Sequence, residues 1–148
     1  MIVECGKVRL RDRSPDDYNR ESIWGLDREI NRLDPIVGKV FNEVAFSIET
    51  LEGQHIGSCM LYNDDGTSIQ LGIRIGDKSF WNTGYGTDAV RALVGHCFAT
   101  TNVERIWLKV LPENIRAIRC YEKCEFEYSG ELLLEGFNFI TMERGRNR

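Results

Sequence analysis

The chain lacks the features that mark several large classes of protein. No apolar run approaches the ~20 residues that a membrane-spanning helix needs, and the amino end has no basic segment followed by an apolar one. We therefore expect a cytoplasmic protein without a membrane partner. The net charge is only -4 and the basic residues are scattered, so nucleic acid is not expected as a main partner.

Histidine and paired cysteines are also scarce. The two-residue cysteine spacings that mark zinc sites are missing among the five cysteines, which are Cys5, Cys59, Cys97, Cys120 and Cys124. Cys120 and Cys124 are one helical turn apart and could share a face, but only His55 and His96 are available to complete a metal shell. We expect reduced, mostly buried thiols and no metal.

The length of 148 residues suits a single domain over 1–148, because chains near ~150 residues usually close around one core. Hydrophobic residues make up 42% and charged residues 28%, as in an ordinary globular protein. The chain shows no internal repeat, low-complexity tract or linker. The order of its elements is therefore the main guide to the fold.

Periodic patterns predict an α+β domain. Alternating or β-rich segments between turn signals predict strands over 8–12, 44–48, 56–62, 69–76, 105–110, 126–130 and 137–142. Helices are expected in one or two short pieces from Ser14 to Leu33, then over 86–99, and again from Asn114. The expected architecture is a mixed, mostly antiparallel central sheet of six to seven strands with about four helices.

The segment between the strand over 69–76 and the next helix suits an anion. It reads Trp81-Asn82-Thr83-Gly84-Tyr85-Gly86-Thr87. A loop that becomes a helix start leaves amide N–H groups unpaired, glycine lets a phosphate approach them, and threonine adds hydroxyl donors. Two glycines before a helix also fit a plain tight turn. Neither the lysine of a Walker loop nor the three-glycine dinucleotide pattern is present.

The last predicted helix carries a second set of candidates. Asn114, Ala117 and Tyr121 are spaced by three and four, so they rise along one helical face. Asparagine can bind a ligand or cap the helix, alanine permits close approach, and tyrosine has a proton to give. A helix cap and a core tyrosine are the alternative interpretation.

Together the two segments resemble the GCN5-related N-acetyltransferase (GNAT) superfamily. Residues 72–77 and 80–89 are similar to its coenzyme A motif, in the form found in ribosomal-protein and spermidine acetyltransferases. Residues 114–123 are similar to its second motif, and the expected element order agrees. Glu125 departs from the pattern, because a glycine commonly stands there.

The resemblance implies an acetyl-CoA-dependent acyltransferase. A sheet splayed between its fourth and fifth strands would hold the cosubstrate acetyl-CoA, and a primary amine would attack it directly in a ternary complex. Tyr121 is then the candidate proton donor and Asn114 holds the carrier or a water. Either Glu49 or a water chain would be the base. The cosubstrate-binding residues implied are Ile73, Arg74, Ile75, Trp81, Asn82, Thr83, Gly84, Tyr85, Gly86, Thr87, Asn114, Ala117 and Tyr121.

Two alternatives stay open at this point. The chain could be a coenzyme A-binding sensor or interaction module that retains the pocket without efficient transfer. If it is an enzyme, the acceptor amine could be a small molecule or a protein N-terminus. A homodimer is compatible with the sequence.

Overall fold

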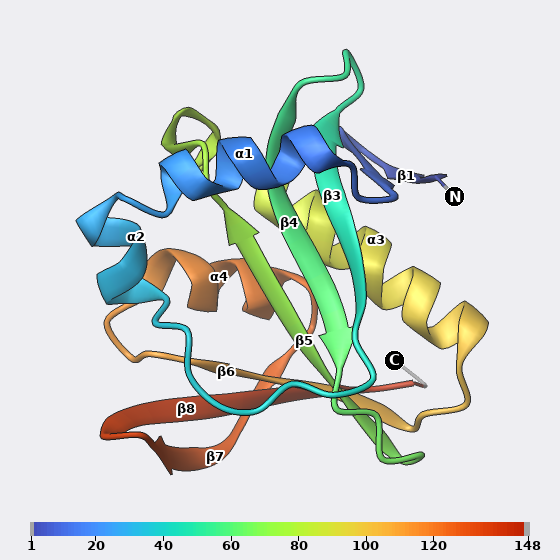
Figure 1. Ribbon diagram of the computed structural model, residues 1–148. Coiled ribbons are helices and arrows are strands. Elements are labelled where there is room, and N and C mark those ends of the chain that lie inside the picture. The colour runs from blue at the N-terminus through green and yellow to red at the C-terminus, as the bar shows by residue number, and fades with distance from the viewer. Residues whose placement is uncertain (1, 147–148) are drawn as a thin grey trace.

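The computed structural model describes residues 2–146. Within this range eight strands form one open sheet, and four α-helices pack around it (Figure 1). The strands are β1 (Ile2–Cys5), β2 (Val8–Arg11), β3 (Val44–Thr50), β4 (His55–Tyr62), β5 (Ser68–Ile75), β6 (Arg105–Val110), β7 (Glu127–Leu134) and β8 (Phe137–Gly145). The helices are α1 (Pro15–Trp24), α2 (Arg28–Leu33), α3 (Tyr85–Thr100) and α4 (Ile115–Lys123). A short 3₁₀ turn, η1 (Lys78–Phe80), precedes α3.

The sheet has the order β1-β2-β3-β4-β5-β6-β8-β7, and every neighbouring pair is antiparallel except β5 and β6. The α+β class and the mostly antiparallel sheet are therefore confirmed. The described chain has one strand more than the six to seven expected. The additional strand is β1, a four-residue edge strand whose residues are exposed or only half-buried.

Two strand ends also differ from the prediction, and one of them is β8, which was expected to end at Met142 but continues to Gly145. β7 was expected to end at Gly130, but it continues to Leu134. A register shift between Tyr128 and Gly130 absorbs the glycine, so the pairing with β8 resumes beyond it.

The fourth and fifth predicted strands correspond to β5 and β6, and the expected splay between them is present. The two strands pair only at their starts, where Ser68 lies opposite Arg105 and Gln70 opposite Trp107. Beyond these residues they diverge, with α4 alongside (Figure 1). In the later parts of the two strands, the backbone N–H and C=O groups of β5 and β6 therefore do not hydrogen-bond to each other.

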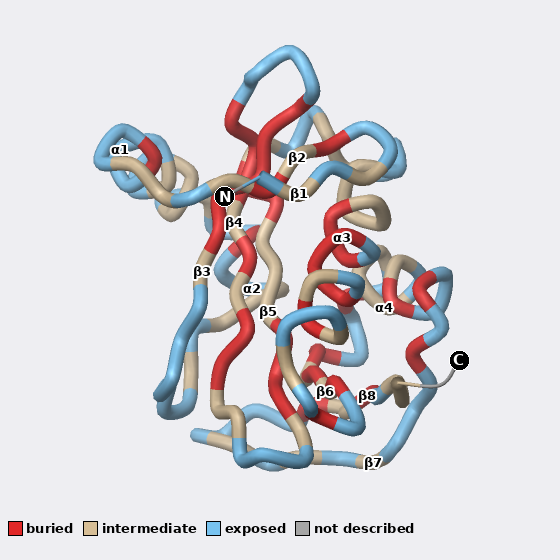
Figure 2. Tube along the Cα trace, turned by 90° about the vertical axis from the view of Figure 1, so that its right-hand side faces the viewer, coloured by how far each residue is buried: buried red, intermediate tan, exposed pale blue. Residues whose placement is uncertain are grey.

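The helices cover the two faces of the sheet. α3 packs behind β1, β2, β4 and β5, whereas α1 crosses in front (Figure 1). Buried residues are concentrated on the strands and on one side of α3 (Figure 2). That side consists of Ala89, Val90, Ala92, Leu93, Val94 and Cys97, within the helix predicted over 86–99. None of the helices among residues 2–146 has the length and apolar content needed to cross a bilayer.

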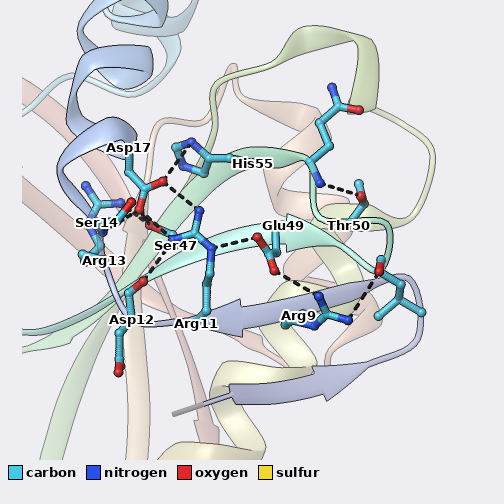
Figure 3. A network of polar contacts seen from close by, with 12 residues as sticks. Arg9, Arg11, Asp12, Arg13, Ser14, Asp17, Ser47, Glu49, Thr50 and His55 are labelled. Atoms are coloured by element: carbon cyan, nitrogen blue, oxygen red, sulfur yellow. Dashed lines mark hydrogen bonds and ion pairs between the residues drawn. The ribbon is translucent and has the colours of Figure 1, made fainter.

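A buried carboxylate fastens α1 to the sheet. Asp17 is 0% exposed and accepts hydrogen bonds from both terminal nitrogens of Arg11, at 2.8 Å each, and from Ser47 Oγ at 2.6 Å (Figure 3). The bonds from Arg11 hold the pKa of Asp17 far below its usual range. Because Arg11 is on β2 and Ser47 on β3, this network fixes α1 across two strands.

Candidate functional site

The divergence of β5 and β6 opens a cavity, here called the strand cleft. It encloses about 720 Å³ including its open mouth. Its walls come from α2, β5, β6 and α4, and it is lined by Ile30, Leu33, Asp34, Pro35, Ile73, Arg74, Ile75, Trp81, Gly86, Lys109, Val110, Leu111, Asn114, Arg116, Ala117, Cys120, Tyr121 and Phe139. The cleft therefore lies along the β5 backbone that lacks pairing from β6, where a strand-like ligand can be bound.

A second cavity, the loop cavity, adjoins the strand cleft at the amino end of α3. It measures about 680 Å³ including open space, and it shares Ile75, Trp81, Gly86, Arg116 and Cys120 with the cleft. Gly84 is the residue before α3 and has φ of 90°, a left-handed conformation that favours glycine. The first turn of α3, whose amides have no intrahelical acceptors, thus faces this cavity.

The turn between β1 and β2 braces the loop that leads into α3. Lys7 Nζ donates to the carbonyl oxygen of Thr83 at 2.7 Å, and Lys7 N donates to Asp88 Oδ2 at 2.9 Å. Gly6 has φ of 56°, and a Cβ there would lie 2.3 Å from Asp88 Oδ2. Glycine is therefore required for the hairpin to approach α3 this closely.

Three cations line the loop cavity from one face of α4. Arg116, Arg119 and Lys123 all border it, and none of them forms an ion pair with a residue in the described range 2–146. The Arg116 guanidinium stacks on the Trp81 ring with 3.8 Å to its centroid, and burial lowers its pKa. Its buried Nε has no hydrogen-bond partner among the described residues. Uncompensated cations beside free helix amides make a strong anion site.

Tyr121 is one of the residues that line the strand cleft. Its side chain is 6% exposed, its ring contacts Phe126, and its hydroxyl forms no hydrogen bond with any residue in the range 2–146. Burial raises the pKa of Tyr121 far above its usual value, so the phenol keeps its proton at neutral pH. A protonated hydroxyl in a cavity can donate to a ligand bound there.

Asn114 and Ala117 line the same cleft but serve α4 directly. Asn114 Oδ1 accepts from Ala117 N at 3.4 Å, and Asn114 Nδ2 donates to the carbonyl oxygen of Leu33 at 3.3 Å. Asn114 is therefore a helix cap that also ties α4 to the end of α2. Its role toward a ligand stays a prediction.

A third cavity, called the α1 cavity, is lined by residues of α1, β4 and β5 and of the segment that follows α2. It encloses about 1370 Å³ including open space, and it shares Asp34, Pro35, Ile73, Arg74 and Lys109 with the strand cleft. Aromatic residues from α1 and β4, among them Trp24 and Tyr62, form part of its wall. A ligand in this cavity could thus meet one in the strand cleft.

Most of the residues predicted for cosubstrate binding border these connected spaces. Those that line the strand cleft or the loop cavity are Ile73, Arg74, Ile75, Trp81, Asn82, Gly84, Gly86, Thr87, Asn114, Ala117 and Tyr121. Thr83 and Tyr85 line neither space. The hydroxyls of Thr83 and Thr87 donate within the protein, to Phe80 O and to Cys120 Sγ, and not into the cavities.

Glu49 is not brought to this site. It accepts from Arg11 Nε at 2.7 Å and from Arg9 Nη1 at 3.1 Å (Figure 3). It borders none of the three cavities. Burial alone would raise its pKa, but the hydrogen bonds from Arg11 and Arg9 hold the pKa of Glu49 below its usual range. A carboxylate held in this way is a poor proton acceptor.

The three cations of α4 were missed in the sequence, although their spacing carried a signal. Arg116, Arg119 and Lys123 follow each other at intervals of three and four, which places them on one helical face. Lys109 and Asp34 were missed as well. Nothing in their local sequence distinguishes them from surface residues.

The cysteines are all unpaired thiols. Cys59, Cys97 and Cys124 are buried, whereas Cys5 and Cys120 are half-buried. Cys120 borders both the strand cleft and the loop cavity, and its hydrogen bond with Cys124 lowers the pKa of Cys120 to about 7. Within the described residues, no group of three or more His, Cys, Asp or Glu side chains is arranged to hold a metal ion.

Comparison with known proteins identifies the family. A probable spermine N(1)-acetyltransferase of Bacillus subtilis subsp. natto (strain BEST195) is 33% identical over 67 residues, 45% of this chain and 44% of that protein. An aminoglycoside N(6')-acetyltransferase type 1 of Klebsiella pneumoniae is 38% identical over 95 residues, 56% of this chain and 47% of that protein. The chain thus spans about half the length of these curated relatives.

A solved structure agrees in fold. The crystal structure of aminoglycoside acetyltransferase AAC(6')-Ib in complex with coenzyme A superposes with a TM-score of 0.81 at 24% identity, covering 94% of this chain and 95% of that one. Residues 6–127 match the family profile described as an acetyltransferase (GNAT) domain. The profile covers most of the chain, and the chain therefore belongs to the GNAT acetyltransferase family.

Proposed function

We propose that the chain is an acetyl-CoA-dependent N-acetyltransferase that transfers an acetyl group to a primary amine within a ternary complex. The observation that carries this proposal is one connected space. It begins at the cations Arg116, Arg119 and Lys123, continues along the open edge of β5, and reaches the free hydroxyl of Tyr121. Family membership and the named relatives support the same activity.

The residues present fit coenzyme A. Its diphosphate needs cations and backbone donors, which the loop cavity offers through α4 and the first turn of α3. Its pantetheine arm carries amides that can pair with a strand edge, which β5 offers in the strand cleft. The solved structure of the aminoglycoside acetyltransferase named above holds coenzyme A, which supports coenzyme A as the ligand.

The transfer step requires three events. The neutral amine attacks the thioester carbonyl carbon, the carbon–sulfur bond breaks, and the leaving thiolate takes a proton while the amine loses one. We assign the proton for the thiolate to Tyr121, whose phenol keeps its proton and forms no hydrogen bond within residues 2–146. Since Glu49 is held by two arginines outside the cavities, we assign the amine's proton to ordered water rather than to Glu49.

The test is a screen of primary amines with acetyl-CoA, in which release of free thiol is followed. We expect turnover on at least one amine. Tyr121→Phe should lower turnover by roughly 10²- to 10⁴-fold, the usual contribution of a general acid, with little change in coenzyme A affinity. Unchanged turnover in Tyr121→Phe would remove this residue from the mechanism, and absence of coenzyme A binding by the native chain would refute the proposal itself.

A second function is favoured by one observation. The two carboxylates nearest to the role of a base are both held by arginines, because Glu49 is bound by Arg11 and Arg9 outside the described cavities and Asp34 is bound by Arg74 through Oδ2. A coenzyme A-binding sensor or interaction module would need no base. Tight binding of acetyl-CoA without turnover on any amine would support this alternative.

The acceptor is the less defined part of the proposal. The relatives are named for spermine and for aminoglycosides, and these are small amines. We propose a small-molecule amine, with a protein N-terminus as the alternative acceptor and a homodimer as a compatible assembly. Analytical ultracentrifugation of the purified chain would test the dimer.

A further inference from the structure

The charges that line the α1 cavity are largely neutralised within the protein. Its two carboxylates are Glu21 and Asp34. Glu21 is bound by Arg13 at 2.6 Å and by His55 at 3.0 Å, and Asp34 is bound by Arg74 Nε at 2.9 Å. Each of the two carboxylates therefore already has a cation of the protein as its partner.

Lys109 is the exception among these charges. It is on β6 and lines both the strand cleft and the α1 cavity. Its Nζ has no hydrogen bond or ion pair within residues 2–146, and its recorded contact is with the Phe139 ring, 5.3 Å from the centroid. Of the two carboxylates that act on it through space, Asp34 is bound by Arg74 and Glu135 accepts from Gly38 N.

Burial makes this isolated ammonium costly. Partial removal from water lowers the pKa of Lys109 below its usual value, because the charged form loses hydration without gaining a partner. A bound anion would supply that partner. A second cation placed beside Lys109 would instead add repulsion.

On the basis of the proposed function, we infer that the acceptor is a small amine that also carries a carboxylate, as an α-amino acid does, and that Lys109 binds this carboxylate. The cavity wall supports an apolar or aromatic remainder of the acceptor, since Trp24, Met60 and Tyr62 line it. The polycationic substrates named for the relatives fit this cavity worse, because several ammonium groups would meet only two carboxylates, both already paired with arginines.

The position of Lys109 also limits where the carboxylate lies in the acceptor. Lys109 borders the cleft assigned to the thioester as well as the cavity assigned to the acceptor. A carboxylate bound to it is therefore next to the place where the two substrates meet. This favours a carboxylate only a few bonds from the reacting nitrogen, and it makes Lys109 a specificity-determining residue.

The experiment uses pairs of amines that differ only in the carboxylate. Tryptophan and tryptamine, phenylalanine and phenethylamine, and spermine as a polycation are titrated into the coenzyme A-loaded chain. Their kcat/KM values with acetyl-CoA are then measured by thiol release. We expect each carboxylated amine to be preferred over its partner by roughly 10- to 100-fold, the value of one hydrogen bond to a charged group.

Two variants separate Lys109 from general effects of charge. Lys109→Gln should bring the preference within each pair close to one, and Lys109→Glu should reverse it. Lys39→Gln removes an equal charge from an exposed residue that lines none of the cavities, and it should leave the preference unchanged.

The outcomes distinguish this inference from the proposed function. Acetylation of tryptamine or spermine in preference to the amino acids would overturn the inference and leave the transferase intact. A preference for the carboxylated amines in Lys109→Gln as strong as that of the native chain, or no binding of any carboxylated amine, would overturn it as well. Preferential binding of the amino acids without turnover would support the inference and refute the transfer, whereas failure to bind coenzyme A would refute the proposed function.

Discussion

Gly86 offers the sharpest test of the cosubstrate site, because there a side chain can be added without disturbing the fold. Gly86 is the second residue of α3 and borders both the strand cleft and the loop cavity. A Cβ at this position would lie 3.8 Å from Cys120 Sγ and 3.9 Å from Ile75 Cγ1, which are ordinary contacts. Gly84 is less suitable, since its φ of 90° would strain any other residue.

The structure sets the expected magnitudes. Alanine in place of a helical glycine raises the free energy of unfolding by about 0.5–1 kcal/mol. The same methyl group would occupy space against the first turn of α3, where we place the diphosphate. Losing one hydrogen bond to a charged group costs about 1.5–3 kcal/mol, so coenzyme A affinity should fall by roughly 10- to 100-fold in Gly86→Ala and further in Gly86→Val.

Calorimetric titration with coenzyme A and urea unfolding measure the two effects separately. Gly95→Ala is the matched control, because Gly95 is an exposed residue of the same helix and its Cβ would meet no atom within 4 Å. This variant should gain similar stability and bind coenzyme A normally. If Gly86→Val folds and binds coenzyme A as tightly as the native chain, the diphosphate does not lie against this turn and the reasoning fails.

Three further predictions concern Asp17, Arg116 and Cys120. Asp17→Asn should lower the free energy of unfolding by about 3–5 kcal/mol in urea, because Arg11 loses a buried partner. The pKa of Asp17 is lower in the folded state, so its contribution to the free energy of unfolding is present above the unfolded pKa of ~3.9 and is lost as pH falls. The stability of Asp17→Asn should therefore decline less steeply in acid than that of the native chain. An equally steep decline would contradict this. Arg116→Gln should weaken coenzyme A binding by roughly 10-fold or more and reduce its salt dependence, whereas the exposed Arg28→Gln should not. Cys120 has a pKa of about 7, whereas burial raises the pKa of Cys59 to about 12, so Cys120 should be alkylated first at pH 7.5. Bound coenzyme A should protect Cys120 from alkylation. Peptide mapping that shows no protection would count against the site.

The periodic patterns were sufficient for most of the fold. Alternation predicted β5 and β6, and the helical stripe predicted α3, because each element buries one face against a continuous core. β1 was missed since a four-residue edge strand buries too little to leave a pattern. The end of β7 was misplaced because the bulge at Gly130 depends on its pairing with β8.

The candidate site was predictable where neighbours in sequence act together. The loop from Trp81 to Thr87 could be predicted from local spacing, and so could the face of α4 that carries Asn114, Ala117 and Tyr121. Glu49 lies outside the cavities, and this could not be predicted because its environment is set by the adjacent strand, where Arg9 pairs directly with it in register. The role of Lys109 depends on which carboxylates nearby are already occupied, and that is a property of the packed protein only.

The brace formed by Gly6 and Lys7 matters for anyone who handles this protein. The loop at the head of α3 is held in part by a hairpin that begins at residue 2, so a tag or fusion partner joined at the front of the chain sits one short strand away from it. A bulky group there would weaken the hydrogen bonds from Lys7 to Thr83 and Asp88 while leaving the interior of the sheet undisturbed. Preparations that fold well yet bind nucleotide-containing ligands feebly should therefore be remade with the tag at the opposite terminus.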